Sequence, residues 1–110
     1  MVKFSFITVN MSPMNSINQK ISFNEDFTAE NATKIKVELA RIIEEGCRNL
    51  ELDMKNVMTA DVVGVNTLAL TYEKLLHNEG TMTIKLSAGG QLAKILHLTK
   101  FSKILTLIYE

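Results

Sequence analysis

Apolar residues recur along this chain at two spacings, and each spacing predicts one kind of element. Steps of three and four residues indicate helices at residues 28–46, 62–77 and 91–98. Alternating apolar and polar residues, or runs with strand composition, indicate strands at residues 3–9, 18–23, 49–54, 81–86 and 104–108. Helices that alternate with strands are typical of crossover units. The sequence therefore predicts an α/β fold with helices packed on a shared sheet, in the order strand, strand, helix, strand, helix, strand, helix, strand.

The first two helices have the clearest boundaries. Thr28 is of the residue type that caps the start of a helix, and Gly46 is of the type that ends one. In the second helix, the spacing turns one stripe of side chains toward the core: Val65, Leu68, Tyr72, Leu75 and Leu76. Pro13 lies in a polar stretch, 10–16, that predicts a loop between the first two strands.

Length and composition narrow the class of protein. The chain has 110 residues, a length typical of one domain, so we expect residues 1–110 to form a single domain. Its 12 Lys and Arg residues balance 12 Asp and Glu residues, which argues against nucleic-acid binding through bulk positive charge. The lone Cys47 excludes an internal disulfide framework and a cysteine-rich zinc site. No apolar run reaches the roughly 20 residues that a membrane span needs, so we expect a cytoplasmic protein without membrane insertion.

The centre of the chain carries a family resemblance. Leu52-Asp53-Met54 has an apolar-Asp-apolar pattern at a strand end, and after a short loop Asp61-Val62-Val63-Gly64 has the pattern of a helix start. In this order and spacing the two motifs resemble the STAS domain family, which includes the bacterial anti-sigma factor antagonists. The likeness extends upstream to residues 27–32 and downstream through 72–80 to 95–101, and it covers roughly residues 21–108.

The resemblance implies both a fold and a function. The expected fold is α/β, with helices packed on a small mixed sheet. The expected function is regulation of transcription by protein–protein binding, because an anti-sigma factor antagonist binds a serine-kinase anti-sigma factor and so releases the sigma factor. The partner-binding residues implied are those at the start of the second helix and in its preceding loop: Thr59, Asp61, Val62, Val63, Gly64 and Asn66.

Val63 is the point at which the chain departs from the switchable antagonists. In those proteins, the second residue after the Asp is a serine that a partner kinase phosphorylates, whereas this chain has Val63 there, preceded by Val62. A phosphate at a helix start is favoured by free backbone N–H groups and alters partner binding through its charge. Valine has neither a hydroxyl to accept phosphate nor a charge to mimic it. We therefore expect a bacterial regulator without the ordinary serine phosphoswitch.

Two other classes of function compete with this interpretation. Some STAS domains are small cytoplasmic subunits of lipid-transport ATPases in membranes, or parts of larger signalling assemblies, and the same helix start would serve them. An enzyme or nucleotide binder needs a convergent set of groups, and the sequence shows no nucleophile beside a base and no cluster of metal ligands. We therefore expect no catalytic residue, no cofactor and no metal. A homodimer remains open.

Several residues of the implied site also have a plainer interpretation. Asp61 either orients a basic group or an acceptor hydroxyl of a partner, or it caps the second helix, and the two roles are compatible. Val62 and Val63 form an apolar docking patch with Leu70, or they pack under the neighbouring loop.

Other polar residues leave similar choices. Thr59 and Thr67, the hydroxyls nearest to Val63, are displaced phosphosites, or else a loop residue and a helix residue bonded to its own backbone. The turn at 87–90 could hold an anion. It lacks the further residues of a phosphate loop, so we interpret it as a strand-to-helix turn with Ser87 near the cap. His77 and His97 have no metal-ligand partner at helical spacing, so we expect solvated or half-buried imidazoles.

Overall fold

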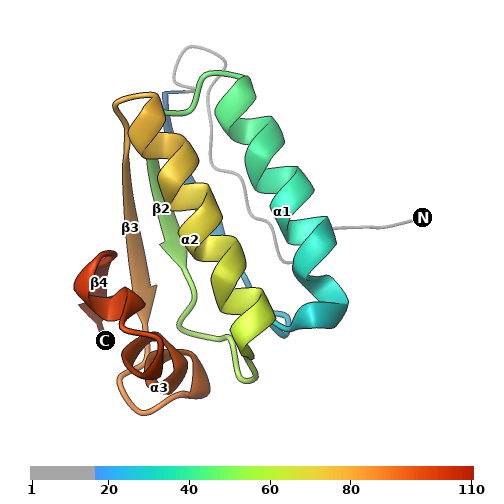
Figure 1. Cartoon of the computed structure of the whole chain (residues 1–110), viewed down its shortest axis with the longest axis vertical. Coiled ribbons are helices and arrows are strands. Elements are labelled where there is room, and N and C mark those ends of the chain that lie inside the picture. The colour runs from blue at the N-terminus through green and yellow to red at the C-terminus, as the bar shows by residue number, and fades with distance from the viewer. Residues whose placement is uncertain (1–16) are drawn as a thin grey trace.

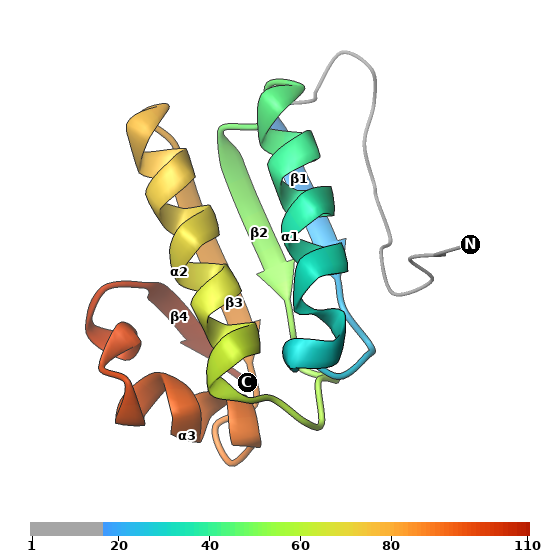
Figure 2. The ribbon, with the colours of Figure 1, turned by 45° about the vertical axis from the view of Figure 1, so that its right-hand side comes forward.

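Helices alternate with parallel strands throughout the part of the chain that the computed structural model describes, residues 17–110. The elements are strand β1 (Asn18–Ser22), helix α1 (Ala29–Glu44), β2 (Asn49–Asp53), α2 (Val62–His77), β3 (Thr81–Leu86), α3 (Gln91–Leu98), the short 3₁₀ helix η2 (Phe101–Lys103) and β4 (Thr106–Tyr109). The strands lie side by side in the order β1-β2-β3-β4, and every pair is parallel (Figures 1 and 2). The predicted α/β fold is confirmed.

Most predicted element boundaries agree with the structure, and one region differs. The predicted helices at 62–77 and 91–98 and the strand at 81–86 have the observed bounds. The last strand begins two residues later than predicted because Ile104 and Leu105 form the turn that follows η2. The predicted strand at 3–9 and loop at 10–16 lie outside the described residues. The four described strands are all parallel, so the described part of the sheet is parallel and not mixed.

The sheet has one apolar face and one polar face. Helices α1 and α2 lie side by side across the apolar face (Figures 1 and 2). Alternate strand residues, such as Leu52 and Ile84, point into this layer and are fully buried. On the opposite face, Lys85 Nζ lies 3.2 Å from Glu51 Oε2. Strand side chains alternate between faces, so the pattern in the sequence decides which face the helices cover.

One predicted core residue is exposed. Leu76 was expected in the core stripe of α2, but about half of its side-chain surface is open to solvent. Leu75 fills the core position, and Leu76 lies about 100° further round the helix. Leu76 instead lines a shallow groove with Phe101 and Ile104, so the prediction for this residue was wrong.

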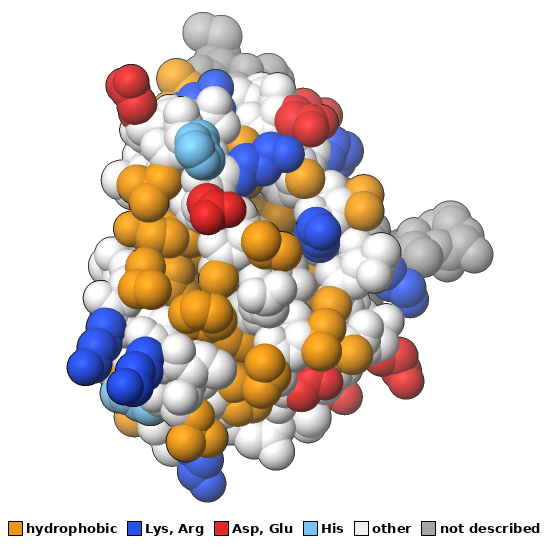
Figure 3. All heavy atoms as spheres, in the orientation of Figure 1, with side chains coloured by type: hydrophobic (Ala, Val, Ile, Leu, Met, Phe, Trp, Pro, Cys, Tyr) orange, Lys and Arg blue, Asp and Glu red, His pale blue; other side chains and the backbone are white. Residues whose placement is uncertain are grey.

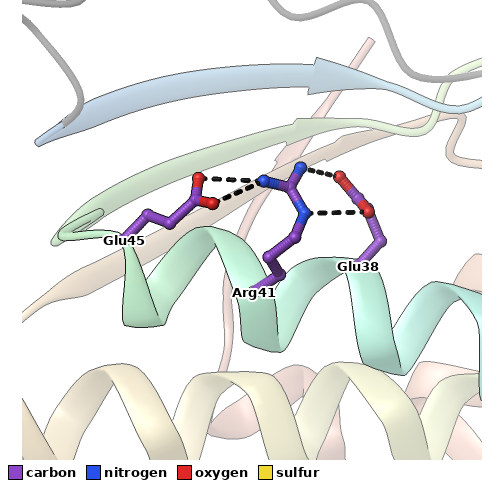
Figure 4. A network of polar contacts seen from close by, with 3 residues as sticks. All are labelled: Glu38, Arg41 and Glu45. Atoms are coloured by element: carbon purple, nitrogen blue, oxygen red, sulfur yellow. Dashed lines mark hydrogen bonds and ion pairs between the residues drawn. The ribbon is translucent and has the colours of Figure 1, made fainter.

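Charged side chains cover the outer face of α1. Arg41 lies between Glu38 and Glu45, donates to both carboxylates, and its Nη1 is 2.8 Å from Glu45 Oε2 (Figure 4). Hydrogen bonds to Glu38 first, and then to Glu45, raise the pKa of Arg41 above its ordinary value. Exposed pairs of this kind contribute about 0.5 kcal/mol each, so the network mainly keeps this face solvated. The first eleven residues of α2, 62–72, include no charged residue, so α2 has no such network there.

Candidate functional site

The loops that lead into α1 and α2 pair with each other. Phe27 and Ala60 form a parallel bridge between the two loops. In it, the N–H of Phe27 donates to the carbonyl of Thr59 at 2.7 Å, and the N–H of Asp61 donates to the carbonyl of Phe27 at 3.2 Å. The two loops follow the neighbouring parallel strands β1 and β2, so both start at the same end of the sheet, where these strands have their carboxyl ends. The bridge fixes the first turns of α1 and α2 side by side.

The carboxylate of Asp61 caps both helices at once. Its Oδ1 accepts the N–H of Gly64 at 2.8 Å, and its Oδ2 accepts the N–H of Ala29, the first residue of α1, at 3.0 Å. Hydrogen bonds from Gly64 first, and then from Ala29, lower the pKa of Asp61 below its ordinary value. The predicted N-cap role is therefore present in the structure. Because both carboxylate oxygens accept backbone N–H groups, the charge of Asp61 stabilises the two helix starts.

Thr28 occupies the predicted N-cap position of α1, but it does not cap through its side chain. Its carbonyl accepts the N–H of Asn31 at 2.9 Å, while Asp61 supplies the capping oxygen for Ala29. The prediction was right about the position and wrong about the capping group. An acceptor from a residue 32 positions away cannot be seen in the local sequence pattern.

Gly64 allows the two helix starts to touch. A Cβ atom added to Gly64 would lie 1.8 Å from the carbonyl oxygen of Phe27, far inside any real contact. That oxygen belongs to the bridge and cannot move without breaking it. The glycine implied by the family resemblance therefore has a physical reason here, which is the close approach of two backbones.

Helix α3 holds the same loop from a third side. Oε1 of Gln91, the first residue of α3, accepts the N–H of Ala60 at 2.9 Å. Gln91 was not among the predicted site residues, because nothing in its local sequence pattern points to residue 60. The loop before α2 is thus tied to α1, α2 and α3, and its backbone conformation is set before any partner arrives.

The most exposed side chains that this frame presents are apolar. Met58, Val62 and Val63 are 79%, 60% and 52% exposed, and they lie within six residues of one another. Thr59 and Asn66 are exposed on the same segment, whereas Gly64 is buried. Of the two interpretations of the valines, exposure favours the docking patch over packing under a loop. Met58 belongs to this surface but was not among the predicted residues, because its exposure depends on the loop path.

The two candidate hydroxyls have opposite environments. Thr67 is only 3% exposed, and its hydroxyl lies 3.5 Å from the carbonyl of Val63 in its own helix. A kinase cannot reach such a side chain in the folded protein. Thr59 is exposed in the loop. Val63 therefore has no accessible neighbouring hydroxyl on α2 within the turn that follows it.

The turn at 87–90 is a strand-to-helix connection, as predicted. Gly90 is the N-cap residue of α3 without a side-chain cap, and its N–H donates to the carbonyl of Ser87 at 3.3 Å, so Ser87 lies near the cap. The hydroxyl of Ser87 instead donates to the carbonyl of Lys55 at 3.1 Å, which ties the turn to the loop after β2. In residues 17–110, no three His, Cys, Asp or Glu side chains gather in a way that could hold a metal ion. No described helix is both long and apolar enough to cross a bilayer.

Comparison with known proteins supports the family. The model of the STAS domain matches residues 6–110. The chain belongs to the STAS domain family. A comparison with curated protein sequences finds no match.

Solved structures with the same fold include anti-sigma factor antagonists. A putative antagonist from Thermotoga maritima has a TM-score of 0.81 at 15% identity, over 97% of this chain and 88% of that one. An antagonist from Mycobacterium paratuberculosis has a TM-score of 0.78 at 21% identity, over 94% and 83%. The antagonist SpoIIAA, in its unphosphorylated form, has a TM-score of 0.69 at 10% identity, over 94% and 88%. At these identities the likeness shows the STAS fold alone.

The substitution Gly64→Ala should destabilise this STAS domain by about 2–4 kcal/mol, because the new methyl group forces the starts of α1 and α2 apart. The gain of about 1 kcal/mol in helix propensity cannot offset this. Gly89→Ala is the matched control, since no atom lies within 4 Å of its added Cβ, and it should change stability by less than about 0.5 kcal/mol. Urea unfolding measures both. Equal stability of the two variants would contradict the close-approach account.

The double cap of Asp61 predicts a pH-dependent loss of stability. Asp61→Ala should cost about 2 kcal/mol at neutral pH, or about 1 kcal/mol for each lost cap. Asp61→Asn should cost less, because one acceptor oxygen remains. A carboxylate with a lowered pKa stabilises the fold above its unfolded value of about 4, and this stabilisation is lost as the pH falls through the folded pKa. The stability gap between the parent and Asp61→Asn should therefore be wider at about pH 6 than at about pH 3 in urea titrations. A gap independent of pH would show that the charge of Asp61 does not matter.

Proposed function

We propose that this STAS domain is an anti-sigma factor antagonist that binds a serine-kinase anti-sigma factor in the bacterial cytoplasm. It acts by binding and not by catalysis, and thereby releases a sigma factor. The binding surface consists of Thr59, Asp61, Val62, Val63, Gly64 and Asn66, together with Met58. The observation that carries the proposal is the exposure of Met58, Val62 and Val63 on a backbone that three helices hold in place.

The physical chemistry of this surface suits a protein partner. Cores of protein interfaces are depleted in charge and enriched in Met, and the exposed apolar side chains of this segment are Met58, Val62 and Val63. Asp61 supports the surface from behind through its two backbone hydrogen bonds. Because the loop is already fixed, little conformational entropy has to be lost on binding, which raises affinity for a given contact area.

Val63 gives this antagonist a different mode of control. The side chain at the position of the family's phosphoacceptor has no hydroxyl, and Thr67, one turn further along α2, is buried. Binding is therefore constitutive, or it is controlled by the amount of the protein or by a different partner. The fold shared with anti-sigma factor antagonists, one of them described in its unphosphorylated form, supports the choice of partner class.

Val63→Asp should weaken binding to the serine-kinase anti-sigma factor of the same organism by at least about 30-fold, because the interface would bury an unpaired carboxylate. The same change favours the start of α2, where acidic residues interact well with the helix dipole, so weaker binding would not come from unfolding. Val37→Asp is the matched control, since Val37 is an exposed valine on the outer part of α1. Isothermal calorimetry with the purified pair measures both.

Each outcome of that titration is informative. Loss of binding in Val63→Asp with retention in Val37→Asp supports the proposed surface. Equal binding by both variants places the interface elsewhere. If the parent protein does not bind the kinase, the antagonist role fails. A purified lipid-transport ATPase that binds the parent and not Val63→Asp would then assign the same surface to the subunit role.

Replacement of Val63 by serine should restore a phosphoacceptor. With the kinase and ATP, the parent protein should take up no phosphate at the start of α2, whereas Val63→Ser should take up one phosphate at residue 63. Mass spectrometry of the intact protein and its peptides identifies the site. Val63→Ala is the control, because it changes the size of the side chain without adding a hydroxyl. Phosphate on Thr59 in the parent protein would show that the switch has moved and not been lost.

A further inference from the structure

In the described part of the chain, the sheet ends at β4, a short edge strand of four residues. The strand Thr106-Leu107-Ile108-Tyr109 contains no charged residue, proline or glycine. Natural proteins usually place a charged residue, a proline or a bulge on a free edge to prevent pairing with another chain. At the other end of the described sheet, β1 carries Lys20. The two ends of the described sheet therefore differ in the feature that decides whether another strand can pair.

The backbone of β4 has hydrogen-bonding groups directed away from the sheet. The N–H of Glu110 donates to the carbonyl of Leu86 in β3 at 2.9 Å. Successive residues of a strand direct their backbone N–H and carbonyl groups to alternate sides, so the backbone groups of Ile108, two residues before Glu110, also point toward β3. The N–H and carbonyl groups of Leu107 and Tyr109 consequently point to the open edge. An extended strand is the occupant that can satisfy such a row of groups.

Apolar side chains are exposed on the same flank. Ile108 and Tyr109 are 41% and 43% exposed, on opposite faces of the sheet. Ile104, just before β4, is also exposed and lines the groove of about 330 Å³ between α2 and η2. Hydrophobic side chains gather over this side of the molecule in the space-filling view (Figure 3). Apolar side chains therefore flank β4 on both faces of the sheet: the groove and Tyr109 on the helix face, and Ile108 on the polar face.

We infer that β4 pairs with β4 of a second copy of this chain, antiparallel and across a two-fold axis at Ile108. The pairing joins the two sheets of four strands into one continuous sheet. Leu107 of each copy then lies opposite Tyr109 of the other, and their outward N–H and carbonyl groups form two symmetric hydrogen-bonded pairs. Ile108 lies opposite its own symmetry mate on the polar face of the sheet.

Two observations favour a second copy over another strand. First, this register places Leu107 opposite Tyr109 and Ile108 opposite its own symmetry mate, and aromatic–aliphatic and aliphatic–aliphatic pairs are favourable across strands. Second, a two-fold contact needs a self-complementary patch, and β4 provides one in its own sequence.

The dimer does not depend on the proposed function. The start of α2 follows the carboxyl end of β2, an inner strand, whereas β4 forms the outer edge of the sheet (Figures 1 and 2). Binding of a regulator at Met58, Val62 and Val63 and pairing at Ile108 use different residues. Failure of one proposal therefore leaves the other standing.

Sedimentation of the full chain from about 10 to about 500 μM tests the inference, because a short edge contact forms a dimer only at the upper end of such a range. The weight-average mass should rise toward twice that of the monomer. Ile108→Lys should keep the protein monomeric throughout, by placing a charge at the two-fold axis. Val37→Lys is the matched control, a lysine at an exposed valine of α1, and it should dimerise as the parent does.

A cross-link provides a second, independent readout. Residues that face each other in a non-hydrogen-bonded antiparallel pair have Cα atoms about 4.5 Å apart, within the range that a disulfide spans. Under mild oxidation Ile108→Cys should form a covalent dimer, and Val37→Cys should not at the same concentration. A monomer over the whole range, a dimer that survives in Ile108→Lys, or equal cross-linking of the two cysteine variants would overturn the inference.

Discussion

The carboxylate of Asp61 is the interaction on which the site depends. Helices α1 and α2 both start at the same end of a parallel sheet, so the unsatisfied N–H groups of their first turns lie close together. One ionised carboxylate accepts a hydrogen bond from each helix, at Ala29 and at Gly64. This sharing works only because the Phe27–Ala60 bridge and the missing side chain of Gly64 let the two backbones touch. The first turns of α1 and α2 thus form one rigid body.

Rigidity at this place has a functional consequence. The frame uses the local negative charge internally, so what remains outside is the apolar surface of Met58, Val62 and Val63. A switchable antagonist of the same family would carry a hydroxyl here and accept a phosphate at a helix start. Under the proposed function, valine makes the same position a contact surface that a kinase cannot modify, which suits constitutive recognition.

The fold could be predicted from the sequence wherever a local pattern decides the structure. The bounds of α2, α3 and β3 follow from spacing and from the glycines and polar residues beside them. The cap of Ala29 by Asp61, the hold of Gln91 on Ala60 and the exposure of Met58 could not, because each depends on residues that are distant in the sequence. Leu76 shows the same limit, since an apolar residue beside a core stripe need not lie in the core.

The most direct test of the account is to map the binding surface by NMR on the isotope-labelled chain as the purified serine-kinase anti-sigma factor is added. The account predicts that the backbone amides perturbed first and most strongly belong to residues 58–66. Amides on the outer face of α1, around the Glu38, Arg41 and Glu45 network, should stay unchanged. Perturbations centred on that charged face, with residues 58–66 unaffected, would contradict it.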